Sequence, residues 1–240
     1  DATQQMASRL KIATDSVKEY NEVQDRLLAL ANATYRPLAE AQEVYLATAG
    51  TMKSLGYSAE EVLAVTESLS LSFTHNATRA DQAQSAQDAL AQSMAKGKVD
   101  ADAWMSIITG ADNVVGDLAR STGRTQEEVR KLGAEGKMSI KELTNALIES
   151  RDRNLELANS MATSSADAIQ AVKNNFTALI GTMNEQYNIS GRVAEVIQRI
   201  GGETGWLETI FHDAMIAIDA LSESFSGVDG EIFIALKQAI

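Results

Sequence analysis

The side chains that could carry acid–base or metal chemistry are few and widely separated in this chain. The only histidines, His75 and His212, have no second histidine at helical spacing, so the sequence lacks the zinc-protease pattern. Cysteine does not occur, which removes disulfides, thiol nucleophiles and thiolate metal sites. We therefore expect no metal and no cofactor, and a structural or surface role for both histidines.

Two pairs of adjacent carboxylates, Glu60-Glu61 and Glu127-Glu128, resemble the acid pairs that glycoside hydrolysis requires. Each pair falls in the first turn of a predicted helix, where acids interact favourably with the positive end of the helix dipole. This position accounts for all four carboxylates without catalysis. We predict no catalytic residue and no enzymatic activity for this chain.

Four glycines, each opening a predicted helix, divide the middle of the chain, and they form two interleaved pairs: Gly56 matches Gly123, and Gly97 matches Gly136. Glycine adopts the left-handed conformation that closes a helix without steric cost. The Gly-Lys steps at Gly97 and Gly136 lack the further glycines and the following Ser or Thr of a phosphate-binding loop. Short helices ordered by internal repetition are more typical of a docking scaffold than of an active site.

The residues after these glycines predict helix N-termini. A hydroxyl or carboxylate stands at each expected N-cap, and a glutamate follows three residues later in three of the four blocks, which is the pattern of a reciprocal capping box. The N-cap residues are Ser58, Asp100, Thr125 and Ser139, and the glutamates are Glu61, Glu128 and Glu142.

Composition predicts an all-α protein of one or two domains. The 240 residues include one proline, 45% apolar residues and 5% aromatic residues, so the core must consist mainly of Ala, Leu, Ile, Val and Met. The net charge is −12, and the Lys and Arg residues are scattered near acids, which argues against direct binding of nucleic acid. The longest uncharged stretches are about half of the roughly 20 residues that a membrane-spanning helix needs. We expect no membrane insertion by this segment alone.

Residues 1–36 predict an amphipathic helix. Apolar or small residues recur at alternating steps of three and four, with Gln24 as a polar interruption. The stripe consists of Leu10, Ala13, Val17, Tyr20, Leu27 and Ala31. Two interpretations remain open: a coiled-coil seam between copies of the chain, or a helix that lies on its own domain.

Residues 37–156 predict an array of short helices. The expected spans are 37–54, 58–73, 81–96, 100–109, 114–119, 126–132 and 140–156. Each is expected to bury a single stripe, so the helices must pack together to be stable.

Residues 157–240 predict a helical extension with a hinge at residues 201–205, where three glycines cluster. The helix after the hinge carries large apolar residues that are either core contacts or a partner-binding surface. The candidate partner-binding residues are Trp206, Ile210, Phe211, Leu221 and Phe225. Because the chain begins at Asp1 and ends without a helix-stop signal, we interpret it as a piece of a longer protein.

Four blocks, in this order, resemble the tape measure domain of tail tape measure proteins from tailed, siphovirus-like bacteriophages. They are residues 49–61, 84–98, 118–123 and 132–137, the last continuing to Leu147. One departure is visible at Ala103-Trp104, where the family pattern has an acid followed by a small aliphatic residue. This departure concerns the local packing and leaves the resemblance intact.

The resemblance implies a structural virion protein that fills the growing tail tube, sets tail length and leaves the tail before DNA passes. It implies the tail tube protein, tail-tip proteins and tail assembly chaperones as partners, and several copies in one tail. Its location would be the lumen or tip of the tail, and the host cytoplasm during assembly. Two alternatives remain: a segment associated with a cell-wall hydrolase, because some family members resemble such enzymes elsewhere, and a coiled-coil adaptor unrelated to phages.

Overall fold

The computed structural model describes residues 2–160, 170, 173–175 and 177–178, and it confirms the all-α fold class. Ten helices lie between Ala2 and Asn159, and the described residues from Gln170 to Ala178 are also helical. Within the described ranges the only β-type pairing is an isolated antiparallel bridge between Val99 and Met138. The helices are α1 Ala2–Ala13, α2 Val17–Thr34, α3 Leu38–Ser54, α4 Ala59–His75, α5 Ala80–Lys96, α6 Ala101–Gly110, α7 Asn113–Thr122, α8 Gln126–Ala134, α9 Ile140–Glu149 and α10 Arg151–Asn159.

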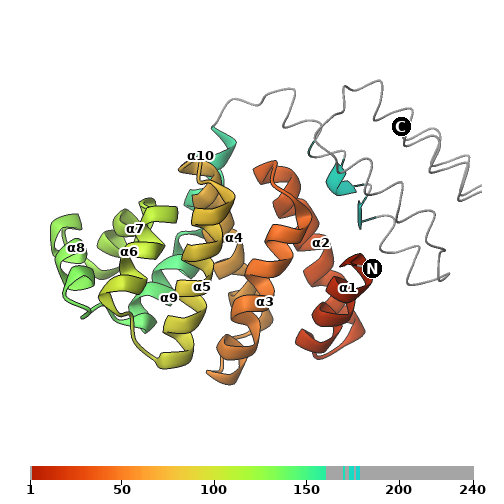
Figure 1. The fold of residues 1–240 in the computed structure, drawn as a ribbon, viewed down its shortest axis with the longest axis horizontal. Coiled ribbons are helices and arrows are strands. Elements are labelled where there is room, and N and C mark those ends of the chain that lie inside the picture. The colour runs from red at the N-terminus through yellow and green to blue at the C-terminus, as the bar shows by residue number, and fades with distance from the viewer. Residues whose placement is uncertain (1, 161–169, 171–172, 176, 179–240) are drawn as a thin grey trace, which may run out of the picture.

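The helices form an extended array with α1 near one end and α8 at the other (Figure 1). Helix α4 lies in the middle and contacts α2, α3, α9 and α10. A single cluster of buried side chains extends from Leu10 in α1 to Ala158 in α10. The predicted domain boundary after residue 36 falls at the turn between α2 and α3, which contact each other, and it stays a prediction.

The N-terminal segment contains two helices where the sequence pattern predicted one. The break lies before Val17, because the Ser16 hydroxyl accepts a hydrogen bond from the Glu19 amide at 3.1 Å and caps α2. Most of the predicted stripe is buried inside the chain, since α1 packs on α3, and α2 packs on α3 and α4. Val17 is the exception, with 77% of its surface exposed. This packing favours the interpretation of helices that lie on their own domain.

Helix α4 is buried on all sides, which differs from the single buried stripe expected of every helix. Its residues from Val62 to Phe73 are all buried, including the hydroxyl residues of this stretch. Burial is tolerated because hydroxyls bond back to carbonyls one turn earlier, as Thr66 does to Val62 at 2.9 Å and Ser72 to Ser68 at 2.7 Å. Other helices satisfy Ser68 and Glu67, whereas the Ser70 hydroxyl is buried without a hydrogen-bond partner among the described residues.

The four glycines all have positive φ, between 66° and 92°. Complete capping boxes form at Ser58 and Thr125, as predicted. At Ser139 only half of the box forms, because the Glu142 carboxylate instead accepts two hydrogen bonds from Arg124, at 2.7 and 3.1 Å. The side-chain cap predicted at Asp100 is wrong.

Asp100 stands at the N-cap of α6 but makes no capping hydrogen bond there. Its carboxylate lies 2.8 Å from Lys98 Nζ and 3.3 Å from Lys96 Nζ. These two lysines come from the Gly-Lys turn and the end of α5, and they draw the carboxylate away from the α6 amides. They also lower the pKa of Asp100 below its ordinary value, Lys98 more than Lys96.

The helix predicted over 140–156 is divided at Ser150 into α9 and α10. Most of the helical extension predicted over 157–240 lies outside the described residues. Within it, the described residues between Gln170 and Ala178 are helical.

Helix α6 packs closely on two neighbours through glycines. A Cβ added at Gly133 of α8 would lie 2.2 Å from the Trp104 ring, and one added at Gly110 would lie 2.8 Å from the Ala86 Cβ in α5. Trp104 itself is 1% exposed. Trp104, which departs from the family pattern, therefore packs against position 133, where any residue larger than glycine would clash with its ring.

Candidate functional site

The five predicted partner-binding residues, Trp206, Ile210, Phe211, Leu221 and Phe225, lie outside the described residues, together with the hinge at 201–205. His212 also lies outside them. His75 is exposed in the last turn of α4. Among the described residues, the candidate sites are the buried polar residues of the array and the groove beside the Gly56 and Gly97 turns.

Three of the four adjacent carboxylates have structural roles. Glu61 completes a capping box by accepting a hydrogen bond from the Ser58 amide at 2.7 Å. Glu128 does the same for Thr125 at 2.7 Å, and the hydrogen bonds from Thr125 lower its pKa. Glu60 faces two arginines, Arg26 at 3.0 Å and Arg151 at 4.0 Å. Glu61 and Glu128 thus act as caps, and Glu60 forms ion pairs. Both pairs lie in the first turn of a helix, as predicted.

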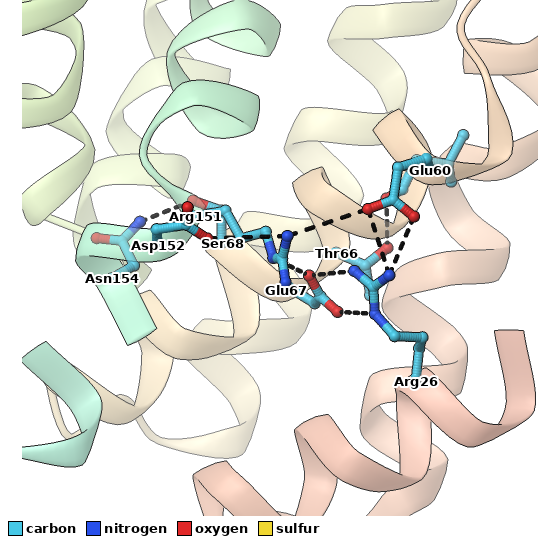
Figure 2. A network of polar contacts seen from close by, with 9 residues as sticks. Arg26, Glu60, Thr66, Glu67, Ser68, Arg151, Asp152 and Asn154 are labelled. Atoms are coloured by element: carbon cyan, nitrogen blue, oxygen red, sulfur yellow. Dashed lines mark hydrogen bonds and ion pairs between the residues drawn. The ribbon is translucent and has the colours of Figure 1, made fainter. Parts of the chain in front are cut away.

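A buried carboxylate, Glu67, lies at the centre of a charged cluster that joins three helices (Figure 2). Its side chain is 9% exposed. Arg26 of α2 donates two parallel hydrogen bonds to it, at 2.7 and 2.8 Å, and Arg151 of α10 lies 2.5 Å away. Two parallel hydrogen bonds of this kind fix the relative orientation of the guanidinium and the carboxylate in addition to pairing their charges. The cluster thus sets how α2 and α10 meet the central helix.

A second polar network joins α10 to α4 and α7. Asn154 of α10 donates to the Ser68 hydroxyl at 2.7 Å and to Asp117 of α7 at 3.3 Å. Arg120 pairs with the other oxygen of Asp117, which is 1% exposed. Burial raises the pKa of Asp117 above its ordinary value, and the hydrogen bond from Asn154 and the Arg120 charge oppose that rise.

Glu67, Asp117 and Asn154 are not among the residues predicted from the sequence to have a function. One signal was present, because Glu67 is the only charged residue between Val62 and Phe73, a stretch otherwise made of apolar and small hydroxyl residues. A lone charge in such a stretch requires a partner when it is buried. The partners could not be identified, because Arg26 and Arg151 lie on distant segments of the chain.

Two of the glycine turns line a surface groove of about 470 Å³ between the ends of α3 and α5 and the starts of α4 and α9. Gly56 and Gly97 lie in its wall. The apolar lining residues are Met52, Leu55, Tyr57, Met94 and Ile140, and the polar ones are Glu61, Lys141, Thr144 and Asn145. Leu55 is 59% exposed. The groove thus brings together one turn from each predicted pair, Gly56 and Gly97.

Within the part of the chain that the structure describes, no group of three or more acidic or histidine side chains could hold a metal ion. Among the same residues, no helix combines the length and the hydropathy that a transmembrane span requires. The geometry defines a class: an acidic, all-α array whose charged residues hold helices together.

The profile of the tape measure protein family matches residues 1–185. The chain belongs to this family, as its sequence blocks predicted. Comparison with curated proteins and with solved structures gives no match. The matched range includes α1 and α2 and extends past α10, so the family unit is wider than the stretch that carries the resemblance in the sequence.

Proposed function

We propose that this chain is a structural tape measure segment that fills the phage tail tube during assembly and leaves the tail before DNA passes. The family implies determination of tail length. The observation that carries the proposal is the family match over residues 1–185, which covers the whole described array. The use of Glu60, Glu61 and Glu128 as caps and ion pairs supports a role without catalysis.

Detection of the chain in phage particles before and after DNA ejection tests this proposal. Antibodies against the array should detect the chain in purified filled phage, and DNA ejection should move it from the particle to the supernatant. A chain that stays with emptied tails would contradict its release. A chain that is absent from filled particles would contradict the structural role as a whole.

An assay on purified peptidoglycan separates this proposal from the hydrolase alternative. The 240-residue chain should release no soluble muropeptides, and a measurable release would contradict the proposal.

The adaptor alternative predicts no tail genes beside this one, whereas a tape measure gene should lie among the genes for tube and tip proteins.

We further propose the tube protein, tail-tip proteins and assembly chaperones as partners, with the Trp206 helix docking on a tail-tip protein or on a neighbouring copy. The double substitution Ile210→Asp with Leu221→Asp tests this docking. If the helix is an interface, tail assembly should fail while thermal unfolding of the chain barely moves. A large drop in the melting temperature would instead mean that the stripe is core.

Several copies in one tail require contacts between chains, but the N-terminal stripe is not free to provide them. Leu10, Tyr20 and Leu27 are buried against their own array. We therefore expect the isolated chain to be at most a weak oligomer. Sedimentation equilibrium that shows a tight oligomer independent of concentration would contradict this expectation.

A further inference from the structure

The groove beside the Gly56 and Gly97 turns combines buried methionines with an exposed leucine. Met52 and Met94 line it and are 0% and 3% exposed, whereas Leu55, which also lines it, is 59% exposed. Methionine side chains adapt their shape to an apolar partner. An exposed leucine beside a hollow lined by methionines is an apolar surface of the kind that receives the side chains of a bound segment.

The groove is large enough for more than one side chain. Its volume is about 470 Å³, within the range of pockets that enclose small ligands. For comparison, an apolar cavity of about 150 Å³ encloses one benzene ring. The groove therefore has room for two large apolar side chains from one segment.

A cation without a partner lines the same groove. Lys141 is exposed in the first turn of α9, and among the described residues it makes no ion pair or side-chain hydrogen bond. A positive charge in the first turn is disfavoured by the helix dipole. The other charged lining residue, Glu61, is already held in its capping box. The groove therefore favours an apolar segment that brings carboxylates and no cations.

One segment of this chain has that chemistry. Residues 206–225 combine large apolar residues with several carboxylates and contain no lysine or arginine. Trp206 and Ile210 are four residues apart, so they lie on one face of the predicted helix, and Asp213 follows within one turn of Ile210. The carboxylates of the segment are Glu208, Asp213, Asp219 and Glu223.

The segment and the groove belong to one molecule, which favours a contact within the chain. Residues 179–205 connect the segment to the described array, and a stretch of this length extends about 40 Å even as a continuous helix. A tether of this kind gives an effective concentration in the millimolar range, far above that of free chains in a dilute solution. The isolated chain should therefore fill its own groove before it fills that of another copy.

We propose that residues 206–225 dock in the groove of their own chain, with Trp206 and Ile210 against Leu55 and a carboxylate beside Lys141. The contact covers the apolar stripe in the isolated chain, and it must be released before the stripe binds a tail-tip protein or a neighbouring copy. Only this release rests on the docking proposed above, because the contact itself belongs to a single chain.

Crosslinking of the full chain tests the contact. The chain has no cysteine, so Leu55→Cys with Ile210→Cys places the only two thiols on the groove and on the segment. A short thiol crosslinker should join them within one chain roughly tenfold faster than in the control Ile12→Cys with Ile210→Cys, whose first thiol is on the exposed side of α1. Equal rates in the two variants, or crosslinks that join two chains, would overturn the proposal.

Charge reversal at the groove gives a second arm. In the chain with Leu55→Cys and Ile210→Cys, Lys141→Glu should slow the intrachain crosslink roughly threefold, because it replaces an attraction to the carboxylates by repulsion. Lys131→Glu is the matched control, since Lys131 is exposed on α8, does not line the groove and has no ion pair among the described residues. An equal effect of the two substitutions on the crosslinking rate would overturn the proposal.

Discussion

The packing of α6 on its neighbours and the packing of α4 on α2 and α10 hold one array together by opposite means. At α6 the contacts are apolar and very close, with Trp104 over Gly133 and Gly110 against Ala86. At α4 the contact to α2 and α10 passes through Glu67 and two arginines. The close contacts at α6 form because Gly133 and Gly110 have no side chain. The contact at α4 depends instead on the negative charge of Glu67.

This difference decides which changes each contact tolerates. A close apolar contact resists any added volume because the surrounding atoms are already at van der Waals distance. The ionic contact accepts changes in shape, since arginine side chains are long and partly hydrated, but it does not tolerate loss of the buried carboxylate. Substitutions at the two contacts should therefore differ in their cost to stability.

Gly133→Ala should have the largest effect. The added methyl group would lie 2.2 Å from the Trp104 ring, so we expect a loss of about 3 kcal/mol in the free energy of unfolding, measured by urea denaturation. The control is Gly50→Ala in α3, which meets nothing within 4 Å and should raise stability by up to about 1 kcal/mol. If both variants behave alike, the close contact between α6 and α8 does not exist.

Glu67→Ala should rank second, with a loss of about 2 kcal/mol. The value is lower than for a fully enclosed pair because Arg26 and Arg151, at 30% and 34% exposed, can turn toward water. Glu60→Ala is the control, since its side chain is 63% exposed and its loss should cost less than about 1 kcal/mol. Equal losses at the two positions would contradict the central role of Glu67.

Asp117→Asn tests the polar network through its pH dependence. Since the pKa of Asp117 is raised in the folded chain, its titration favours folding below the ordinary carboxyl pKa of about 3.9, and this contribution is lost as pH rises through the folded value. Wild-type stability relative to the variant should therefore fall as pH rises from about 4 toward 7. Glu128→Gln should show the opposite slope, because the pKa of Glu128 is lowered. If the two stability differences changed with pH in the same direction, the environments assigned to Asp117 and Glu128 would be wrong.

Tyr45→Phe should have the smallest effect. The Tyr45 side chain is 0% exposed, and among the described residues its hydroxyl has no hydrogen-bond partner. Removing an unpaired buried hydroxyl should leave stability unchanged or raise it by less than about 1 kcal/mol, measured by thermal unfolding. A clear loss of stability would reveal a partner for this hydroxyl.

Local features of the fold could be predicted from the sequence, and pairings between distant residues could not. The hydroxyl and glutamate at Ser58 and Thr125 act within one helical turn, so their capping boxes were predicted correctly. Ser139 has the same pattern, but Arg124 from another segment binds its glutamate. The helix break at Ser16 carried a readable signal, a serine with Glu19 three residues later, which the apolar stripe obscured.

The candidate site shows the same limit. The spacing of Glu61 from Ser58 predicted its role as a cap. The first-turn position of Glu60 was also predicted, but its ion pairs with Arg26 and Arg151 were not. In contrast, the pairing of Glu67 with Arg26 and Arg151 depends on how α2, α4 and α10 pack, and no local spacing encodes it. The Trp104 contact is similar, because the glycine that accommodates it lies on a different helix.

The bridge between Val99 and Met138 has a mechanical consequence. It joins the chain just before α6 to the chain just before α9, so α6, α7 and α8 form a loop whose two ends meet. Tension applied along the backbone from the two sides of this loop would be borne by the bridge together with the packing of α6 on α5 and of α7 on α9. Separation of these contacts would then release the length of the three helices into the stretched chain.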